Sequence, residues 1–235
     1  MHLDDGMATF VLIHGVYQGG WIWSSVASRL RAAGHSVHAP SLDGCAERTA
    51  QARPGITTET HAEEIAELLR YEDLSEVVLV GTSAGGMVVA RVAELARARI
   101  RRLVFVDALA LLDGEKIPDI VDRPPEITTD VAVGLSRDGA LNTLRAGMEP
   151  GLAAWAADRF GLYPVAAFNE PVVLASFWDQ SWDASVIYCR QSTAPGEAHQ
   201  RRCAEALGAR WHELDTGHYP MLSTPDELAH LILEG

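Results

Sequence analysis

The sequence predicts an α/β fold in which a mostly parallel central sheet is covered by helices on both faces. Short apolar runs, typical of buried strands, alternate along the chain with amphipathic stretches typical of helices. The clearest unit is an apolar run at residues 77–80, followed by Gly-Thr-Ser-Ala-Gly-Gly at 81–86 and a helix-compatible stretch at 87–96. A strand, a tight turn and a helix in this order are typical of a parallel sheet.

Length and composition fit a single domain spanning residues 1–235. Of these residues 48% are apolar, enough for a substantial core. A formal charge of −13 disfavours binding to nucleic acid or to an anionic membrane. The three cysteines have no metal-binding spacing, and no apolar stretch is as long as a membrane span. We therefore predict a cytoplasmic monomer or homodimer that needs no metal or other cofactor and acts on a small molecule.

The first half of the chain supplies two strands and two helices before the glycine-rich turn. A strand is expected at residues 9–13, and the helix after it ends at Gly34. A short strand is expected at residues 35–39. The next helix, at residues 58–70, would bury one apolar face, made of Ile65, Leu68 and Leu69.

The second half continues the alternation around an irregular segment. A strand at residues 103–106 ends at Asp107, and the pattern fails from residue 113 to residue 183. Six prolines interrupt that segment, although residues 140–148 and 152–160 have helical patterns. We interpret it as a mainly helical insertion that covers the sheet. Regular order returns with a strand at 185–189, a helix at 197–207, a strand at 209–214 and a last helix after Thr224.

The turn at residues 81–86 is a candidate catalytic element. A chain that reverses between a strand and a helix crowds backbone atoms around the central residue, and glycine at positions 81 and 85 removes side chains that would collide there. Ser83 is then exposed above the edge of the sheet. The alternative is a tight glycine turn with an incidental serine.

A serine hydroxyl needs a base, and an acyl-transfer site needs donors for the oxyanion. His218 follows the expected strand at 209–214 and comes after Gly217, which leaves room for the imidazole. The oxyanion donors would be the backbone N–H groups of Val16 and Ala84. His14 is expected to shape the early loop rather than to act as the base.

Beyond these motifs, the chain resembles a known family, the α/β-hydrolases of the plant methylesterase and hydroxynitrile lyase type with their bacterial relatives. The resemblance spans nearly the whole chain. It rests on Phe10-Val-Leu-Ile-His-Gly, Gly19-Gly-Trp-Ile-Trp, Gly34-His35 before Ala39-Pro40, Gly81-x-Ser-x-Gly-Gly-Met, Leu103-Val-Phe-Val-Asp-Ala and Leu214-Asp-Thr-Gly-His. It implies an α/β-hydrolase fold with a lid at about residues 113–183. It also implies a serine hydrolase that cleaves a carboxylic ester or thioester of a medium-sized apolar or aromatic compound.

The acid that orients His218 departs from the pattern of the family. Relatives place an aspartate just after the strand equivalent to residues 185–189, whereas here the loop at 190–195 has Ser192 and no carboxylate. We predict Asp107 instead, because some α/β-hydrolases, such as haloalkane dehalogenases, place the acid there. The alternatives are that Asp107 only caps the following segment and that Asp179 or Asp183 is the acid. Asp215 is too near His218 along the loop to orient its ring.

Aromatic residues concentrated in the insertion suggest the walls of a substrate pocket. The residues expected to line it are Gly15, Tyr17, Trp155, Phe168, Trp178, Trp182 and Tyr219.

Two other functions stay open. Hydroxynitrile lyases of the family have threonine and lysine where this chain has Gly15 and Tyr219, which disfavours cyanohydrin cleavage. A lyase, cyclase or elimination enzyme of another kind could still use the same pocket for proton transfer. A binding protein without catalytic activity is the second alternative.

Overall fold

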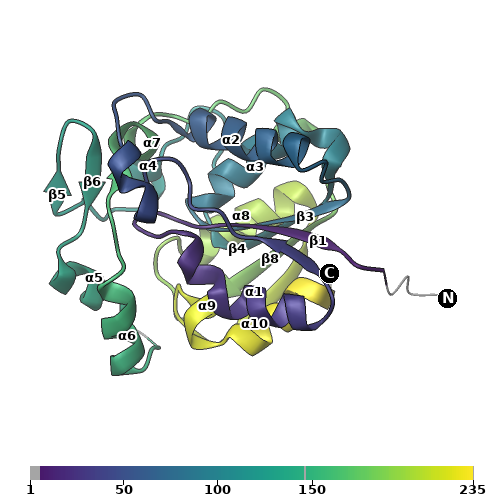
Figure 1. Cartoon of the computed structure of the whole chain (residues 1–235). Coiled ribbons are helices and arrows are strands. Elements are labelled where there is room, and N and C mark those ends of the chain that lie inside the picture. The colour runs from purple at the N-terminus through teal and green to yellow at the C-terminus, as the bar shows by residue number, and fades with distance from the viewer. Residues whose placement is uncertain (1–5, 146, 235) are drawn as a thin grey trace.

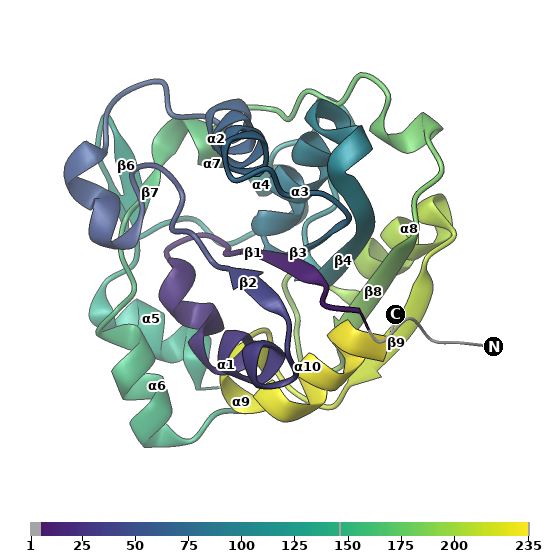
Figure 2. The same ribbon diagram turned by 45° about the vertical axis from the view of Figure 1, so that its right-hand side comes forward.

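A six-stranded, entirely parallel sheet forms the centre of the protein. The computed structural model describes residues 6–145 and 147–234. The strands lie in the order β2–β1–β3–β4–β8–β9 (Figures 1 and 2). Their bounds are β1 (Thr9–Ile13), β2 (Ser36–His38), β3 (Val77–Ser83), β4 (Ile100–Ala108), β8 (Ala184–Cys189) and β9 (Arg210–Leu214). The predicted α/β class with a parallel sheet is confirmed.

Helices cover both faces of this sheet (Figure 1). One face packs against α2 (Thr58–Tyr71), α3 (Gly85–Leu95) and α8 (Glu197–Leu207), and the other against α1 (Ser24–Ala32) and α10 (Pro225–Glu234). The strands alternate between the two cores. Thus Val77 and Leu79 of β3 face the first, whereas Val78 and Val80 face the second. Among the described residues, no helix is both long and apolar enough to cross a membrane.

The boundary of β4 differs most from its predicted position. The strand starts at Ile100, three residues before the expected start, because the charged Arg101 and Arg102 mask its beginning in the sequence. Arg102 is 4% exposed, and its guanidinium donates a hydrogen bond to the carbonyl of Ile232 in α10. Burial lowers the pKa of Arg102 to about 10. This arginine therefore links the sheet to the last helix.

The segment between β4 and β8 is irregular, as expected, but it is less purely helical than predicted. It contains a three-stranded antiparallel sheet in the order β5–β6–β7, whose strands have only two or three residues each. Strands this short show no period in a sequence. The elements are α4 (Ile117–Ile120), β5 (Ile127–Thr128), β6 (Ala132–Gly134), α5 (Arg137–Leu144), α6 (Pro150–Ala157), β7 (Tyr163–Pro164), α7 (Val165–Asn169) and the 3-10 helix η4 (Phe177–Asp179).

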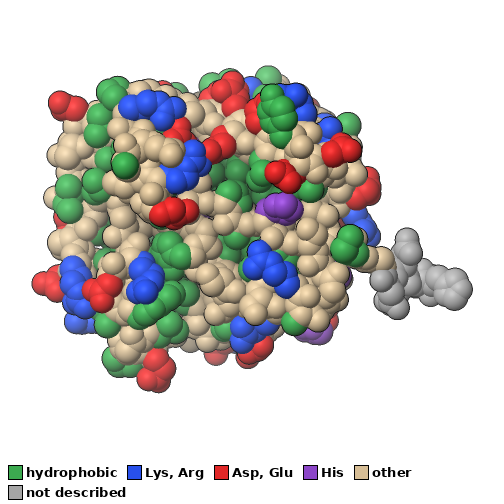
Figure 3. Space-filling model, in the orientation of Figure 1, with side chains coloured by type: hydrophobic (Ala, Val, Ile, Leu, Met, Phe, Trp, Pro, Cys, Tyr) green, Lys and Arg blue, Asp and Glu red, His purple; other side chains and the backbone are tan. Residues whose placement is uncertain are grey.

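Short helical turns complete the connections between these elements. They are the 3-10 helices η1 (Gly20–Trp23), η2 (Ala46–Gln51) and η3 (Arg97–Arg99), and the short helix α9 (Pro220–Ser223). Acidic and basic side chains are interspersed over the face seen in Figure 3.

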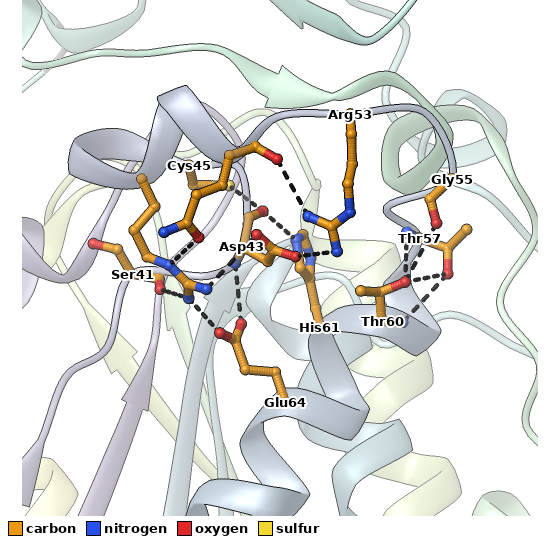
Figure 4. Close-up of polar contacts among 11 residues, drawn as sticks. Ser41, Asp43, Cys45, Arg53, Gly55, Thr57, Thr60, His61 and Glu64 are labelled. Carbon is orange, nitrogen blue, oxygen red and sulfur yellow. Dashed lines mark hydrogen bonds and ion pairs between the residues drawn. The ribbon is translucent and has the colours of Figure 1, made fainter.

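A polar cluster fixes the long loop between β2 and α2 (Figure 4). The main chain of Asp43 accepts a hydrogen bond from His61 Nε2 at 2.9 Å, and its amide donates to the carboxylate of Glu64 at 3.0 Å. The Asp43 carboxylate pairs with Arg53 at 2.8 Å. At the end of the loop, the Ile56 carbonyl accepts a hydrogen bond from Ala167 of α7 at 3.1 Å. The loop thus joins the sheet domain to the insertion.

Close packing between α3 and the main chain of β1 predicts a strict requirement for glycine at position 85. A Cβ atom there would lie 2.6 Å from the carbonyl oxygen of Ile13 and 2.8 Å from that of His14. We expect Gly85→Ala to lower the melting temperature by several degrees, because backbone must move to admit the methyl group.

The matched control is Gly151→Ala, at a helical position where a Cβ would meet no atom within 4 Å. This change should be neutral or stabilising. Equal melting temperatures for the two variants in a thermal denaturation experiment would contradict the prediction.

Candidate active site

Ser83 lies at the end of β3 in a strained conformation. Its φ is 51°, in the left-handed region that residues other than glycine seldom adopt. The surrounding glycines allow this turn. A Cβ at Gly81 would lie 2.7 Å from the Gly85 carbonyl oxygen, and one at Gly15 would lie 2.5 Å from the Cβ of Ser83. The strand–turn–helix predicted from the sequence is therefore built with Ser83 at its apex.

Asp107 occupies a bulge at the end of the neighbouring strand. In the register of β3 and β4, Thr82 pairs with Val106 and Ser83 pairs with Ala108, so Asp107 is the extra residue. Its φ is 44°, also left-handed, and its side chain is fully buried. The bulge therefore turns the carboxylate away from the direction that a regular strand would give it.

Three hydrogen bonds hold the chain that follows this bulge. The Leu109 amide donates to the Ser83 carbonyl at 2.8 Å, which links Ser83 to the chain just after the bulge. From α8, Gln200 Nε2 donates to the Ala108 carbonyl at 2.9 Å, and His199 Nε2 accepts from the Ala110 amide at 3.1 Å. Together they hold the bulge that carries Asp107 in place.

His218 meets the Asp107 carboxylate from the loop between β9 and α9. The distance from His218 Nδ1 to Asp107 Oδ2 is 2.5 Å, and the other carboxylate oxygen lies 3.4 Å from the Cys189 amide. The imidazole side chain is 17% exposed, so it is still accessible from the pocket side. The other carboxylates considered contact arginines: Asp215 pairs with Arg190 and Asp183 with Arg210. Asp179 lies in η4 of the insertion.

Ser83 and His218 both line one pocket at this edge of the sheet. About 570 Å³ of empty space lies between its walls, part of it continuous with solvent. Of the residues predicted for the pocket, Tyr17, Phe168 and Tyr219 line it, and so does Val16. Gly15 packs closely against Ser83 and does not line the pocket. The sequence did not single out the remaining lining residues, which are Gln18, Leu109, Ile117, Val121, Arg123, Leu135, Thr143 and Ala194.

Three of the residues predicted for the pocket, Trp155, Trp178 and Trp182, do not line this pocket. Trp155 is 39% exposed and packs edge-on against Trp21, with ring centroids 5.5 Å apart. Trp178 donates from Nε1 to the carbonyl of Leu111 at 3.1 Å, and Trp182 stacks on Phe177 at 5.4 Å. These large rings hold the insertion to itself and to the sheet domain. Aromatic composition does not distinguish this role from a pocket wall.

Two amide groups flank Ser83, one from Val16 in the early loop (residues 14–20) and one from Ala84 in the turn after β3. The N–H groups of Val16 and Ala84 have no hydrogen-bond acceptor within the part of the chain that the structure describes. Val16 lines the pocket, and Ala84 directly follows Ser83. Both positions fit donors for a negatively charged oxygen at Ser83.

His14 holds this loop in place through hydrogen bonds to the main chain. Its Nε2 accepts a hydrogen bond from the Leu42 amide at 3.0 Å, and Nδ1 lies 2.8 Å from the Gly15 carbonyl, to which it donates. Both ring nitrogens are thus used by the main chain. Burial lowers the pKa of His14 to about 4, so the ring is neutral near pH 7.

Comparison with known protein families identifies the family to which this fold belongs. A family model described as "Alpha/beta hydrolase family" matches residues 10–231. The chain is 37% identical over 130 residues to a carbendazim hydrolyzing esterase of Nocardioides sp. (strain SG-4G), an alignment that covers 54% of each protein. It is 26% identical over 254 residues to methylesterase 3 of Arabidopsis thaliana, covering 95% of this chain and 94% of that one. Thus the first match spans about half the length of its relative, and the second spans nearly all of it.

Solved structures of other proteins share the fold of this chain. An extracellular alpha/beta-hydrolase from a Paenibacillus species, described as sharing structural and functional homology with tobacco salicylic acid binding protein 2, superimposes with a TM-score of 0.86. That match has 25% sequence identity and covers 97% of this chain and 98% of the other. The methylesterase MES16 from Arabidopsis superimposes with a TM-score of 0.80 at 19% identity, covering 97% and 98% of the two chains.

Buried neutral histidines around the site predict a protein that loses stability in mild acid. Burial lowers the pKa values of His14, His61 and His199 to about 4, below the 6.5 of an unfolded chain. Between these values the unfolded state binds more protons, so the free energy of unfolding falls as the pH falls. Each imidazole contributes a slope of up to about 1.4 kcal/mol per pH unit.

Urea denaturation at several pH values between 7.5 and about 4.5 measures this slope. A His61→Gln variant should show a shallower slope, since it removes one buried imidazole. His230→Gln, at an exposed ring that pairs with Glu234, should leave the slope unchanged. If the slope of His61→Gln equals that of the parent protein, buried His61 is not a source of the acid lability.

Proposed function

The chain belongs to the alpha/beta hydrolase family, and we propose that it is a serine hydrolase that cleaves a carboxylic ester or thioester of a medium-sized apolar or aromatic small molecule. The observation that carries the proposal is the hydrogen bond between His218 and the buried carboxylate of Asp107, in a pocket that Ser83 also lines. Relatives whose names describe esterases support ester hydrolysis as the reaction class.

In the proposed reaction, Asp107 orients His218, and His218 accepts the proton of Ser83. The bond from His218 Nδ1 to Asp107 directs Nε2 as a proton acceptor for the Ser83 hydroxyl. Ser83 Oγ forms a bond to the ester carbonyl carbon while its proton passes to His218. The bond from that carbon to the leaving oxygen, or to sulfur in a thioester, then breaks. His218 gives its proton to the leaving group, and a water molecule releases the acid and regenerates Ser83.

Two backbone N–H groups are available to stabilise the negative charge that develops on the substrate carbonyl oxygen. The amides of Val16 and Ala84 would stabilise the oxyanion, and the main-chain crowding between Gly15 and Ser83 fixes their separation from the nucleophile. No metal or cofactor enters any step.

Cyanohydrin cleavage is the less favoured candidate, although the chain is 33% identical over 147 residues to an alpha-hydroxynitrile lyase of Arabidopsis thaliana. Tyr219 lines the pocket where lyases of this type have a lysine. At position 15 the backbone leaves no room for a side chain beside Ser83. A different lyase or elimination reaction would be indicated by a Ser83→Ala variant that keeps full activity. Ligand binding alone would be indicated by a parent protein that a ligand protects strongly and that forms no product.

The cellular compartment, the oligomeric state and the partners of the protein stay predictions. The three cysteines are buried and free, as a reducing compartment would require, and a single-domain monomer or homodimer remains the expected form. The expectation that the protein binds neither nucleic acid nor membrane rests on its charge of −13.

A fluorophosphonate probe tests the nucleophile. We expect a covalent adduct on Ser83, identified by peptide mapping, because the probe reacts with serines that a neighbouring base activates. The Ser83→Ala variant should take up no probe and should lose hydrolysis of simple aryl esters. An intact peptide without adduct in a folded protein would remove the acyl-enzyme mechanism.

Replacing Asp107 by asparagine tests the acid. We expect kcat to fall by about 10³- to 10⁴-fold, since an amide that donates to His218 favours the wrong tautomer of the imidazole. The fold should persist, because asparagine has nearly the same volume. Asp215→Asn is the matched control: this carboxylate is 67% exposed and pairs with Arg190, so activity should not change. Near-normal turnover by Asp107→Asn would leave Asp107 with a structural role only.

A further inference from the structure

The pocket contains one cation that the hydrolytic mechanism does not use. Arg123 lies in the insertion just before Pro124 and Pro125, and it lines the pocket together with Ser83 and His218. Apart from Arg123 and His218, the lining residues are uncharged. The carboxylate of Asp107 lies behind His218 and is fully buried, so it does not face the pocket. The one permanently charged side chain in the lining is therefore a cation, in a chain whose formal net charge is −13.

The guanidinium of Arg123 has no partner within the described part of the chain. Other arginines of the protein form ion pairs, donate to carbonyl or amide oxygens, or stack on aromatic rings. Arg101, which is exposed at the start of β4, is the other exception among the described residues. Arg123 differs from Arg101 because it faces a pocket.

Among the described residues, no polar group near Arg123 forms an ion pair or a hydrogen bond with its guanidinium. Its positive charge acts on the hydroxyls of Tyr17 and Tyr219, which line the same pocket. Burial nevertheless raises the pKa of Tyr17 to about 12, and it raises the pKa of Tyr219 as well, so both phenols are uncharged near pH 7. Glu126 lines an adjoining depression with Arg123, but no ion pair joins these two described side chains, and the Glu126 carboxylate accepts hydrogen bonds from the amide and hydroxyl of Ser136.

An unpaired guanidinium beside an apolar wall fits a particular kind of ligand. Ile117, Val121 and Leu135 line the pocket with Arg123 and offer contact to a carbon skeleton. A guanidinium presents a planar set of donors that matches a carboxylate, which it can hold with two parallel hydrogen bonds. A molecule with an ester at one end and a carboxylate at the other would satisfy both regions of the pocket.

We propose that Arg123 binds a carboxylate of the substrate, so that the preferred substrates are half-esters of dicarboxylic acids with an aliphatic or aromatic skeleton. This inference rests on the proposed ester hydrolysis and adds the substrate class. Hydrolysis by Ser83 converts such a half-ester and water into the free dicarboxylate and an alcohol. Arg123 is a specificity-determining residue in this scheme and takes no part in bond breaking.

Matched esters test the proposal in the folded, full-length protein. Monomethyl and dimethyl adipate, and monomethyl and dimethyl terephthalate, share a skeleton and differ by one negative charge. Methanol release gives kcat/KM for each ester. We expect the half-ester to be preferred by up to about tenfold, which is the lower end for a charged hydrogen bond, because Arg123 is an exposed residue at the pocket. The preference should fall as the salt concentration rises.

Variants assign the preference to a residue. In Arg123→Gln the ratio of the two kcat/KM values should fall about tenfold, and Arg123→Lys should recover part of it. Arg101→Gln removes the same charge outside the pocket and should leave both kcat/KM values unchanged. The proposal is overturned if the parent enzyme shows no preference for the half-ester, if Arg123→Gln keeps the preference, or if Arg101→Gln loses it equally.

A binding experiment separates this proposal from the proposed function. In the Ser83→Ala background, calorimetry measures the affinity for monomethyl terephthalate without turnover. A dissociation constant that rises about tenfold on adding Arg123→Gln supports carboxylate recognition even if no ester is hydrolysed. An unchanged dissociation constant, or no binding by Ser83→Ala, rejects it. Failure of the fluorophosphonate probe to label Ser83 would reject the hydrolase mechanism alone.

Discussion

The contact between Asp107 and His218 depends on a carboxylate that is fully buried, and much of the architecture serves to place it. A buried carboxylate is costly unless hydrogen-bond donors surround it, and here the donors come from His218 and the Cys189 amide. The bulge in β4 aims the side chain, and hydrogen bonds from Gln200 and Leu109 hold the strained main chain. Strain at Ser83 and at Asp107 is thus stabilised by the same packed edge of the sheet.

Two parts of the molecule, the sheet with its helices and the insertion, contribute different residues to the pocket. The parallel sheet and its helices position Ser83 and His218, whereas the insertion supplies much of the pocket wall, including Arg123 and Phe168. A hydrogen bond from the Gly161 amide to the Tyr17 carbonyl connects the insertion to the early loop at 2.8 Å. The pocket is therefore lined by residues from two structurally distinct parts of the chain.

Sequence reasoning succeeded where local patterns have a direct physical cause. Apolar strands, the glycines around Ser83 and the glycine before His218 indicated the sheet and the site, because close backbone approach requires residues without side chains. It failed for the tryptophans of the insertion, since a large ring packs equally well against a neighbouring ring or a ligand. Sequence reasoning also did not identify Arg123 as a pocket residue, because this arginine is not part of a recognisable motif.

The sequence by itself determined the order of strands and helices, the turn that exposes Ser83, and a short list of carboxylates that could serve His218. Only the tertiary structure decided among them: Asp107 touches His218, while Asp183 and Asp215 contact arginines. The difference has a physical reason. Periodicity and glycine spacing act over a few residues along the chain, whereas the partner of a side chain 111 positions away depends on strand register, one bulge and the packing of α8.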